Sequence, residues 1–508
     1  MLDATPLARA YARWRLFSLR RLDPAAAQEA ALEALLKRAQ DTRFGRAHGF
    51  AEIRHVAEYQ RRVPLRTWED FWREWWAGHF PRLEHVSWPG LIPYFAETSG
   101  TTSGTTRQIP VSREMVKANR RAALDVLAFH LAAWPESRVL KGRNFLLGGS
   151  TALTRLEKGV WAGDLSGIAA AEIPFWVRRR TFPPAKLALL GDWERKISAL
   201  APASLEAEVT SISGTPSWML LFFSEIGRLR PGQKLGRIYP GLELVVHGGI
   251  GFEPYRAAFA EWLAGSRAET REVYAASEGF VAVADRGEGE GLRMLLDNGI
   301  FYEFVRPEAL QERAPERCWI GNAEIGVEYA LVLSTNAGLW SYVLGDTIRL
   351  VDREPPRLMV TGRVGWLLSV AGEHLIGEEL DAAVAEAAAT LGEQVADYTA
   401  AALPPRSGEP RAGHLFVVEI ESTAGDVRES FAHALDAALT RTNDDYAAHR
   451  SGGFGLRPPE VVLAPPGTFA AWMQSRGKLG GQNKVPRVIR DEALLHELLR
   501  FIAERGGR

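Results

Sequence analysis

The sequence is short of cysteine, of long apolar runs and of net charge. Cys318 is the only cysteine among 508 residues, which excludes an intramolecular disulfide and a multi-cysteine zinc site. This usage fits a reducing compartment, and we expect a cytoplasmic protein. The formal net charge of -1 lacks the basic field of a dedicated nucleic-acid binder, so no nucleic-acid partner is expected. No run of about 18 apolar residues occurs, which predicts no membrane span.

Several common nucleotide and hydrolase motifs are also missing. No Gly-Lys-[Ser/Thr] closes a Walker A loop, no Gly-x-Ser-x-Gly elbow occurs, and the glycines at 248–251 lack the full dinucleotide fingerprint. Lysine is scarce, with nine in the chain and none between Lys234 and Lys478. Lys484 then lies in a Gly-rich polar turn at 480–487. Both a compact charge beside phosphate or carboxylate and a solvated surface lysine remain open interpretations.

The most unusual stretch is Thr98–Thr106, in which seven of nine residues carry a hydroxyl and the other two are glycines. Such a segment has poor helix propensity. Its backbone N–H groups and hydroxyls can wrap an anion, and polyphosphate is the leading candidate ligand. A flexible linker is the competing interpretation of this stretch alone.

Two further motifs place an acid after an apolar strand. In Tyr274–Gly279, Glu278 follows the hydroxyl of Ser277, an arrangement that suits Mg²⁺, which takes hard oxygen ligands. In Tyr342–Thr347, Asp346 follows a glycine, and its carboxylate can accept two hydrogen bonds from a ribose diol. An ordinary acid at a strand end or in a turn also explains each motif in isolation.

The pattern of elements predicts an α/β fold. Strands alternate with helices between residues 143 and 276, and a later run of strands up to 351 predicts an added β subdomain. The composition changes at 361–365, so we predict a large N-terminal domain, 1–362, and a small C-terminal α/β domain, 363–508. The segment 161–184 has no clean period and is interpreted as loop and pocket lining. Helices are predicted, among others, over residues 24–39, 115–133, 377–391 and 426–448.

The N-terminal stretch 4–22 contains five arginines and no acid. Leu7, Tyr11, Trp14 and Phe17 recur at steps of three or four residues, which predicts an amphipathic helix. We expect this helix to dock on the large domain. A membrane-surface or targeting role is the alternative for a basic amphipathic helix.

Taken in order, these motifs resemble the plant auxin-responsive acyl-acid amido synthetase family, part of the acyl-adenylate-forming superfamily. The matching stretches are 98–107 (Ser/Thr/Gly phosphate loop), 274–279 (Tyr-Ala-x-Ser-Glu), 301–304 (a family strand), 342–346 (Tyr-x-x-Gly-Asp) and 482–487 (Gln-Tyr-Lys-x-Pro-Arg). The resemblance spans essentially the whole chain. The sequence departs from it at Arg107, where the family usually has Lys, and at Asn483, where it usually has Tyr.

The resemblance implies an ATP- and Mg²⁺-dependent ligase with a large adenylate-forming domain and a small mobile domain that rotates about 362–365. The enzyme would adenylate a small carboxylic acid and pass the acyl group to an amine, an amino acid, forming an amide. Glu278 would hold Mg²⁺, and Lys484 would contact the adenylate or the incoming amine. The residues implied to bind nucleotide are Thr98, Ser99, Gly100, Thr101, Thr102, Ser103, Ser277, Tyr302 (against adenine), Asp346 (on the ribose) and Arg363.

The acceptor and the acyl pocket are less defined. Trp161, Phe175, Trp176 and Trp218 are candidate pocket walls, and core packing explains each of them equally well. Coenzyme A or a carrier-protein thiol is the alternative acceptor. An alternative of another class is a nucleotide-binding protein without catalysis, and the joint presence of the two acids and Lys484 speaks against it.

Overall fold

The structure is a computed structural model. It describes residues 3–98, 106–190, 193–249, 252, 256–287, 289–364, 367–373, 375–393, 395–406, 409–421, 425–451, 455–476, 485–486 and 488–505. The chain divides into two compact units, the first drawn mainly from residues up to 364 and the second mainly from 365–508. This division falls just after the boundary expected from the composition.

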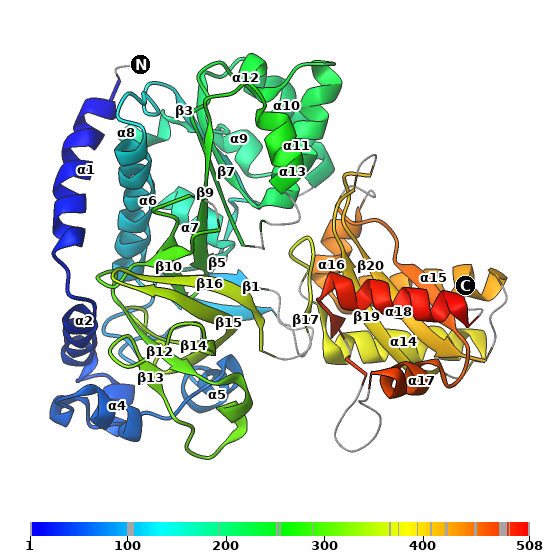
Figure 1. Ribbon diagram of the computed structural model, residues 1–508. Coiled ribbons are helices and arrows are strands. Elements are labelled where there is room, and N and C mark those ends of the chain that lie inside the picture. Colours follow the sequence, from blue (N-terminus) through cyan, green and yellow to red (C-terminus); the bar gives the residue numbers. More distant parts are fainter. Residues whose placement is uncertain are drawn as a thin grey trace. The chain divides into compact units, whose positions relative to one another are not determined.

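The first unit is built on a large mixed sheet (Figure 1). In spatial order its strands are β13 (Cys318–Trp319), β12 (Ile300–Val305), β14 (Glu328–Thr335), β15 (Tyr342–Arg353), β16 (Pro356–Arg363), β11 (Leu292–Met294), β10 (Gly279–Val283), β9 (Glu269–Ala276), β8 (Leu244–Gly248), β7 (Val209–Gly214), β3 (Arg143–Leu147) and β6 (Thr181–Phe182). Pairing is parallel from β9 to β6 and antiparallel from β9 to β13. The predicted late strands make up the antiparallel part of this sheet.

The first unit also contains helices, some of which cover both faces of the parallel part of its large sheet. The longer ones are α1 (Thr5–Arg20), α2 (Pro24–Ala39), α6 (Arg113–Ala133), α10 (Trp193–Leu205), α11 (Pro216–Leu229) and α13 (Arg256–Leu263); the shorter ones are α3 (Arg43–Ala47), α4 (Val56–Arg62), α5 (Trp68–Phe71), α7 (Leu165–Ala171), α8 (Phe175–Arg178), α9 (Ala185–Ala188) and α12 (Leu235–Ile238). Leu244 of β8 packs with α1 and α6, whereas His247 on the opposite face stacks near Phe259 of α13. Burial on both sides explains the continuous apolar run of β8.

The N-terminal helix docks on the first unit, as expected. α1 lies alongside α6 (Figure 1), and its buried residues include Ala12, Arg15 and Leu19. Trp14 and Phe17 are exposed. The physical reason is an ion-pair network, because Arg15 forms bidentate contacts with both Asp125 and Asp297 and fixes the rotation of the helix.

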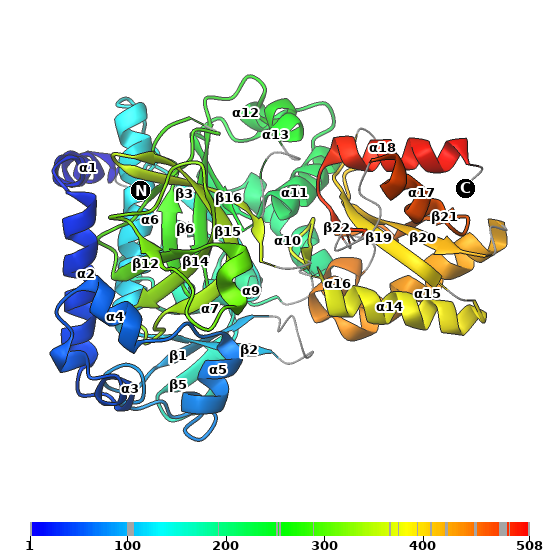
Figure 2. The same cartoon turned by 60° about the horizontal axis from the view of Figure 1, so that its bottom comes forward.

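A second, smaller sheet in this unit has the order β2 (Arg107–Val111), β1 (Tyr94–Thr98), β5 (Val160–Gly163) and β4 (Leu153–Glu157), and it lies near α5 (Figure 2). β1 and β2 are antiparallel, with Thr98 opposite Arg107, so the hydroxyl-rich stretch connects two paired strands. The segment 161–184, interpreted as loop, instead contains α7, α8 and β6.

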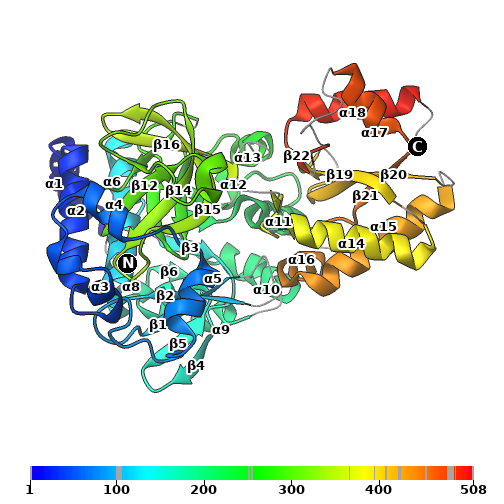
Figure 3. The same cartoon turned by 90° about the horizontal axis from the view of Figure 1, so that it is seen from below.

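The second unit is a sheet covered by helices on both faces (Figure 3). Its strands are β21 (Glu460–Ala464), β20 (Gly413–Ile420), β19 (Val395–Leu403) and β22 (Val488–Ile489), with a separate pair β17 (Leu367–Leu368) and β18 (Leu375–Ile376). α14 (Gly377–Leu391), α15 (Gly425–Thr442) and α16 (Asp444–Arg450) cover one face, and α17 (Thr468–Ser475) and α18 (Glu492–Glu504) the other. Successive side chains of β20 point to opposite faces of the sheet, so Phe416 packs in the core on one face and Val417 in the core on the other.

A fully buried acid–histidine pair lies in this unit. Nε2 of His414 is 2.7 Å from Oε1 of Glu373, whose carboxylate also accepts the backbone N–H groups of Val370 and Ala371. Burial alone would raise the pKa of Glu373, but the charge of His414 and these hydrogen bonds outweigh it and lower the pKa to about 2. Glu373 is therefore ionised in the folded unit at neutral pH.

None of the described helices is both long and apolar enough to cross a bilayer.

Candidate active site

A hairpin turn and a strand of the large sheet carry the acids predicted to bind nucleotide. β9 and β10 form a tight hairpin in which Ala276 pairs with Gly279, so Ser277 and Glu278 occupy the turn. Gly279 allows this turn to approach Ile300 of β12 closely. Any larger residue would clash, because a Cβ at this position would lie 2.7 Å from the side chain of Ile300. Asp346 lies on β15 directly after Gly345, which has a positive φ of 92°. Both carboxylates are nearly buried.

The two motifs exchange hydrogen bonds. Tyr274, the first residue of one motif, donates its hydroxyl to Oδ2 of Asp346 at 2.6 Å. Tyr342, the first residue of the other motif, donates its hydroxyl to Oε1 of Glu278 at 3.2 Å. Each tyrosine therefore orients the acid of the other motif, and the two motifs are linked although their strands are not neighbours in the sheet.

Tyr342 is a hydrogen-bond donor at neutral pH. Its side chain is fully buried, and burial, followed by the charge of Glu278, raises its pKa well above the usual value. The charges of Arg107 and Glu69 also act on this hydroxyl, in opposite directions, so both groups lie in its neighbourhood.

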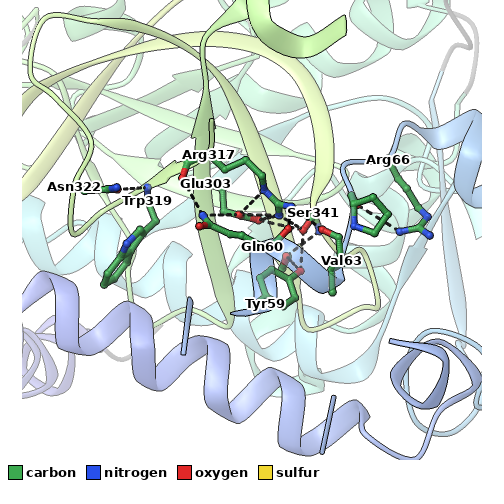
Figure 4. Close-up of polar contacts among 11 residues, drawn as sticks. Tyr59, Gln60, Val63, Arg66, Glu303, Arg317, Trp319, Asn322 and Ser341 are labelled. Atoms are coloured by element: carbon green, nitrogen blue, oxygen red, sulfur yellow. Dashed lines mark hydrogen bonds and ion pairs between the residues drawn. The ribbon is translucent and has the colours of Figure 1, made fainter. Parts of the chain in front are cut away.

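A buried polar network holds the start of the β15 motif (Figure 4). Ser341 precedes Tyr342 with a φ of 46°, a left-handed conformation that is uncommon outside glycine. Its N–H donates to the hydroxyl of Ser334, and its own hydroxyl lies 3.0 Å from the hydroxyl of Tyr59 and 3.2 Å from Oε2 of Glu303. These contacts determine where the strand that carries Tyr342 begins.

The centre of that network is an ion pair. Nε and Nη2 of Arg317 contact the two carboxylate oxygens of Glu303 at 3.0 and 2.8 Å, and the Glu303 side chain is fully buried. Gln60 donates to the same carboxylate at 3.1 Å, and Arg317 also donates to the carbonyl of Val63 (Figure 4). The pair joins α4, β12 and the segment before β13 directly beneath the motif.

The base of the hydroxyl-rich hairpin is also tied down. Arg107 forms an ion pair with Glu69 of α5, and its guanidinium lies 5.8 Å from the centre of the Trp68 ring. Trp68 in turn donates its indole N–H to the carbonyl of Gln108 at 3.2 Å. A cation therefore closes the loop at the position where the resemblance expects one.

Not every predicted site residue belongs to this arrangement. Tyr302 is fully buried, and its hydroxyl donates to the backbone carbonyls of Val281 and Leu295. These contacts give it a core role and leave no face of its ring exposed to adenine. Trp161 is partly exposed on β5, whereas Trp218 lies on α11, which packs against the large sheet.

Other predicted residues are only partly described. The backbone of Arg363 pairs with Asp346 at the end of β16, and Thr98 ends β1. Phe175 and Trp176 lie on α8, and their side chains, with that of Arg363, are outside the described part. Ser99, Gly100, Thr101, Thr102, Ser103 and Lys484 are outside the described residues altogether.

Sequence reasoning missed the residues that orient the acids. Tyr274 and Tyr342 were recognised as parts of motifs but were given no role, and Tyr59, Gln60 and Arg317 were not considered. The one available signal was that each acid follows a tyrosine by four residues. Nothing in the sequence indicates that the partners are crossed between motifs.

The carboxylates of the candidate site suit a metal ion that arrives bound to the nucleotide better than one held permanently by the protein alone. Among the described residues no group of three or more His, Cys, Asp or Glu side chains could hold a metal ion. Glu278 offers a carboxylate whose one oxygen is oriented by Tyr342. Mg²⁺ in phosphate-transfer sites is commonly held by one or two carboxylates together with substrate phosphates, so a single carboxylate fits.

The fold and the site define a two-unit α/β protein in which two acidic motifs of the large sheet are joined by crossed hydrogen bonds. Family comparison matches the GH3 family N-terminal domain to residues 15–267, the central domain to 293–363 and the C-terminal domain to 378–493. The chain belongs to the GH3 family.

Curated relatives are distant. Indole-3-acetic acid-amido synthetase GH3.3 of Arabidopsis thaliana is 27% identical over 245 residues, 45% of this chain and 40% of that protein. Probable indole-3-acetic acid-amido synthetase GH3.9 of Oryza sativa subsp. japonica is 30% identical over 237 residues, 42% of this chain and 53% of that protein. The chain thus matches about half or less of the length of these relatives.

Solved structures share the fold over nearly the whole chain. The AtGH3.15 acyl acid amido synthetase in complex with 2,4-DB has a TM-score of 0.59 at 17% identity and covers 97% of this chain and 96% of that one. A 2-hydroxyisobutyryl-CoA ligase in complex with 2-HIB-AMP and CoA has a TM-score of 0.58 at 17% identity and covers 94% and 92%. At this identity the likeness concerns the fold alone.

Proposed function

We propose that this protein is an ATP-dependent, AMP-forming acid–amine ligase. It adenylates a small carboxylic acid and transfers the acyl group to an amine, an amino acid, forming an amide. The exchange of hydrogen bonds between the two motifs supports this most, because it joins the motifs that carry Glu278 and Asp346 into one buried arrangement. Membership of the GH3 family supports it independently.

In the first half-reaction the substrate carboxylate attacks the α-phosphorus of ATP, and pyrophosphate leaves. The protein's task is to position the groups and offset charge, so no protein nucleophile is required. Asp346, oriented by Tyr274, accepts hydrogen bonds from the ribose hydroxyls. Thr98, the loop 99–103 and Arg107 supply donors and a cation to the phosphates, with Ser277 and Arg363 nearby. Mg²⁺, when bound through Glu278, adds positive charge at the phosphates.

In the second half-reaction the amine attacks the acyl carbonyl, AMP leaves with the electron pair of the broken bond, and the amine releases a proton. We assign Lys484 to the contact with the adenylate or the amine. We also propose that the second unit rotates about residues 362–365 between the two steps, so that each step uses its own set of groups.

The acceptor is proposed to be an amine because the curated relatives are named as amido synthetases. A thiol acceptor is the second candidate, since a CoA ligase shares the fold. We propose that Trp161, Phe175, Trp176 and Trp218 line the acyl pocket and favour an aromatic or other apolar acid. With one cysteine in the chain, a cytoplasmic location belongs to the same proposal.

The test is ATP–pyrophosphate exchange with a panel of aromatic and aliphatic carboxylic acids, without amine or thiol. We expect one class of acid to stimulate exchange and Glu278→Gln to abolish it. Glu136→Gln, which removes the charge of an exposed glutamate, is the matched control and should leave exchange unchanged. Binding of ATP without exchange for any acid would favour a non-catalytic nucleotide-binding protein, and absence of ATP binding would refute the proposal.

The acceptor is then identified with the stimulating acid. Incubation with ATP and each amino acid, or with coenzyme A, is followed by mass spectrometry of the product. An amide formed without thiol supports the ligase as proposed. Turnover that requires coenzyme A would replace the amine with a thiol acceptor and leave the adenylation step standing.

A further inference from the structure

The outer face of α1 is a surface that the proposed reaction does not use. Leu7, Trp14 and Phe17 are 78%, 62% and 56% exposed, and with Ala10 they recur at steps of three or four residues. They therefore form one apolar stripe along the helix. Within the first unit, α1 lies at the edge, with α6 on its inner side (Figures 1 and 2).

The stripe cannot be buried by turning the helix. Arg15, on the opposite face, is 3% exposed and forms bidentate contacts at 2.6 to 2.9 Å with Asp125 and Asp297. Rotation that moved the stripe inward would break these contacts and leave buried charges without partners, which is costly. The same ion pairs that dock α1 therefore hold its apolar stripe outward.

Positive charge surrounds the stripe. Arg13, Arg20 and Arg21 are exposed, and residues 4–22 contain no acid. In the described part of the chain these three arginines take part in no ion pair, and the guanidinium of Arg21 lies 4.3 Å from the centre of the Phe17 ring. A row of Trp, Phe and Leu beside arginines on one helix is the composition of helices that lie in the interface of a bilayer.

We propose that the outer face of α1 binds an anionic lipid surface, with Trp14, Phe17 and Leu7 inserted at headgroup level and the arginines contacting lipid phosphates. Charge favours this occupant over a second copy of the chain, because two such faces would bring their arginines together. The cytoplasmic leaflet, which is rich in anionic lipid, has the matching charge.

The experiment is co-sedimentation of the full chain with phosphatidylcholine vesicles, with and without phosphatidylserine, over a range of salt. We expect binding only to the anionic vesicles and weaker binding as salt rises. Trp14→Gln with Phe17→Gln should weaken binding at least about tenfold, because two large apolar groups no longer leave water. Ile325→Gln with Met359→Gln, two exposed apolar residues elsewhere in the first unit, is the matched control and should bind as the unaltered chain does.

A charge series tests the electrostatic part. Arg13→Gln with Arg20→Gln should weaken binding about tenfold or more, at about 1 kcal/mol per arginine, whereas Arg230→Gln with Arg237→Gln, two exposed arginines of the same unit, should not. Circular dichroism and adenylation in solution should be unchanged in all four variants, which keeps this test independent of the proposed function.

The outcomes separate the possible occupants. Failure to bind either vesicle, or equal binding by the Trp14/Phe17 variant, overturns the proposal. A concentration-dependent dimer that the same variant dissociates would assign the face to a second copy. Capture of an acidic protein without any lipid binding would assign it to a protein partner.

Discussion

The hydroxyl of Tyr342 offers the sharpest test of how the site is organised. Tyr342→Phe keeps the buried ring and removes the group that donates to Oε1 of Glu278 at 3.2 Å. A hydrogen bond to a charged group contributes about 1.5–3 kcal/mol. The length of this one places it toward the lower end of that range, and a loss of about 1.5 kcal/mol corresponds to roughly tenfold in rate.

We therefore expect Tyr342→Phe to lower the rate of ATP–pyrophosphate exchange about tenfold. Because the lost contact orients the Glu278 carboxylate, the Mg²⁺ concentration needed for half-maximal exchange should rise, while the KM for the acid stays unchanged. The assay is exchange at saturating acid, titrated with Mg²⁺ at fixed ATP. A purely structural role would lower the unfolding temperature without moving this Mg²⁺ dependence.

Tyr302→Phe is the matched control. Tyr302 is as deeply buried as Tyr342, and its hydroxyl donates to two backbone carbonyls and to no acid. Its loss should cost about 1–3 kcal/mol of stability through unsatisfied carbonyls and leave exchange unchanged. Unaltered Mg²⁺ dependence in Tyr342→Phe would refute the reasoning, and a raised KM for ATP in Tyr302→Phe would restore its predicted contact with adenine.

Three further outcomes follow from the described contacts. Asp346→Asn should raise the KM for ATP at least about tenfold, because it removes the charge that accepts the ribose hydroxyls and weakens the hydrogen bond from Tyr274 that orients this side chain; initial-rate kinetics of exchange measure this, and an unchanged KM would contradict it. Arg317→Met should cost about 3–5 kcal/mol in denaturant unfolding because it leaves the buried Glu303 carboxylate without its partner, and a double variant with Glu303→Gln should recover part of that loss. Because the pKa of Glu373 is lowered from 4.5 to about 2 in the folded state, its stabilisation is complete above pH 4.5 and is lost as the pH falls toward 2. Urea unfolding between those pH values should show that the free energy of unfolding falls by an amount on the order of 3 kcal/mol. Glu373→Gln is already destabilised by the loss of its contact with His414, so its free energy of unfolding should not show this fall.

The sequence predicted elements well where local signals agreed. The helix over 24–39 matches α2 because an Asp cap precedes a proline at its first position, and 377–391 matches α14. The predicted helix over 426–448 is broken in the structure, because the side chain of Asn443 caps α16. β19 was missed since its Ala-rich run has weak strand propensity and owes its conformation to pairing with β20.

Orientation was harder to predict than the elements themselves. The apolar period of α1 was recognised, but it does not indicate which face docks, and the structure shows Arg15 buried there in ion pairs with Asp125 and Asp297. The partner Asp297 lies far along the chain, so no local pattern could show it. The short elements within 161–184 were missed for the related reason that their residues have no clear period.

In the candidate site, too, the sequence predicted which residues matter but not how they are arranged. The acids Glu278 and Asp346 were predictable because each ends a recognisable strand motif. Their arrangement was not, because each is oriented by the tyrosine of the other motif across the sheet. Crossed partners make the two motifs one unit: a change in either tyrosine acts on the acid of its neighbour and not on its own. A substitution at Tyr274 should therefore be interpreted through Asp346 and ribose, and one at Tyr342 through Glu278 and the phosphates, which is the reverse of what motif order alone would assign.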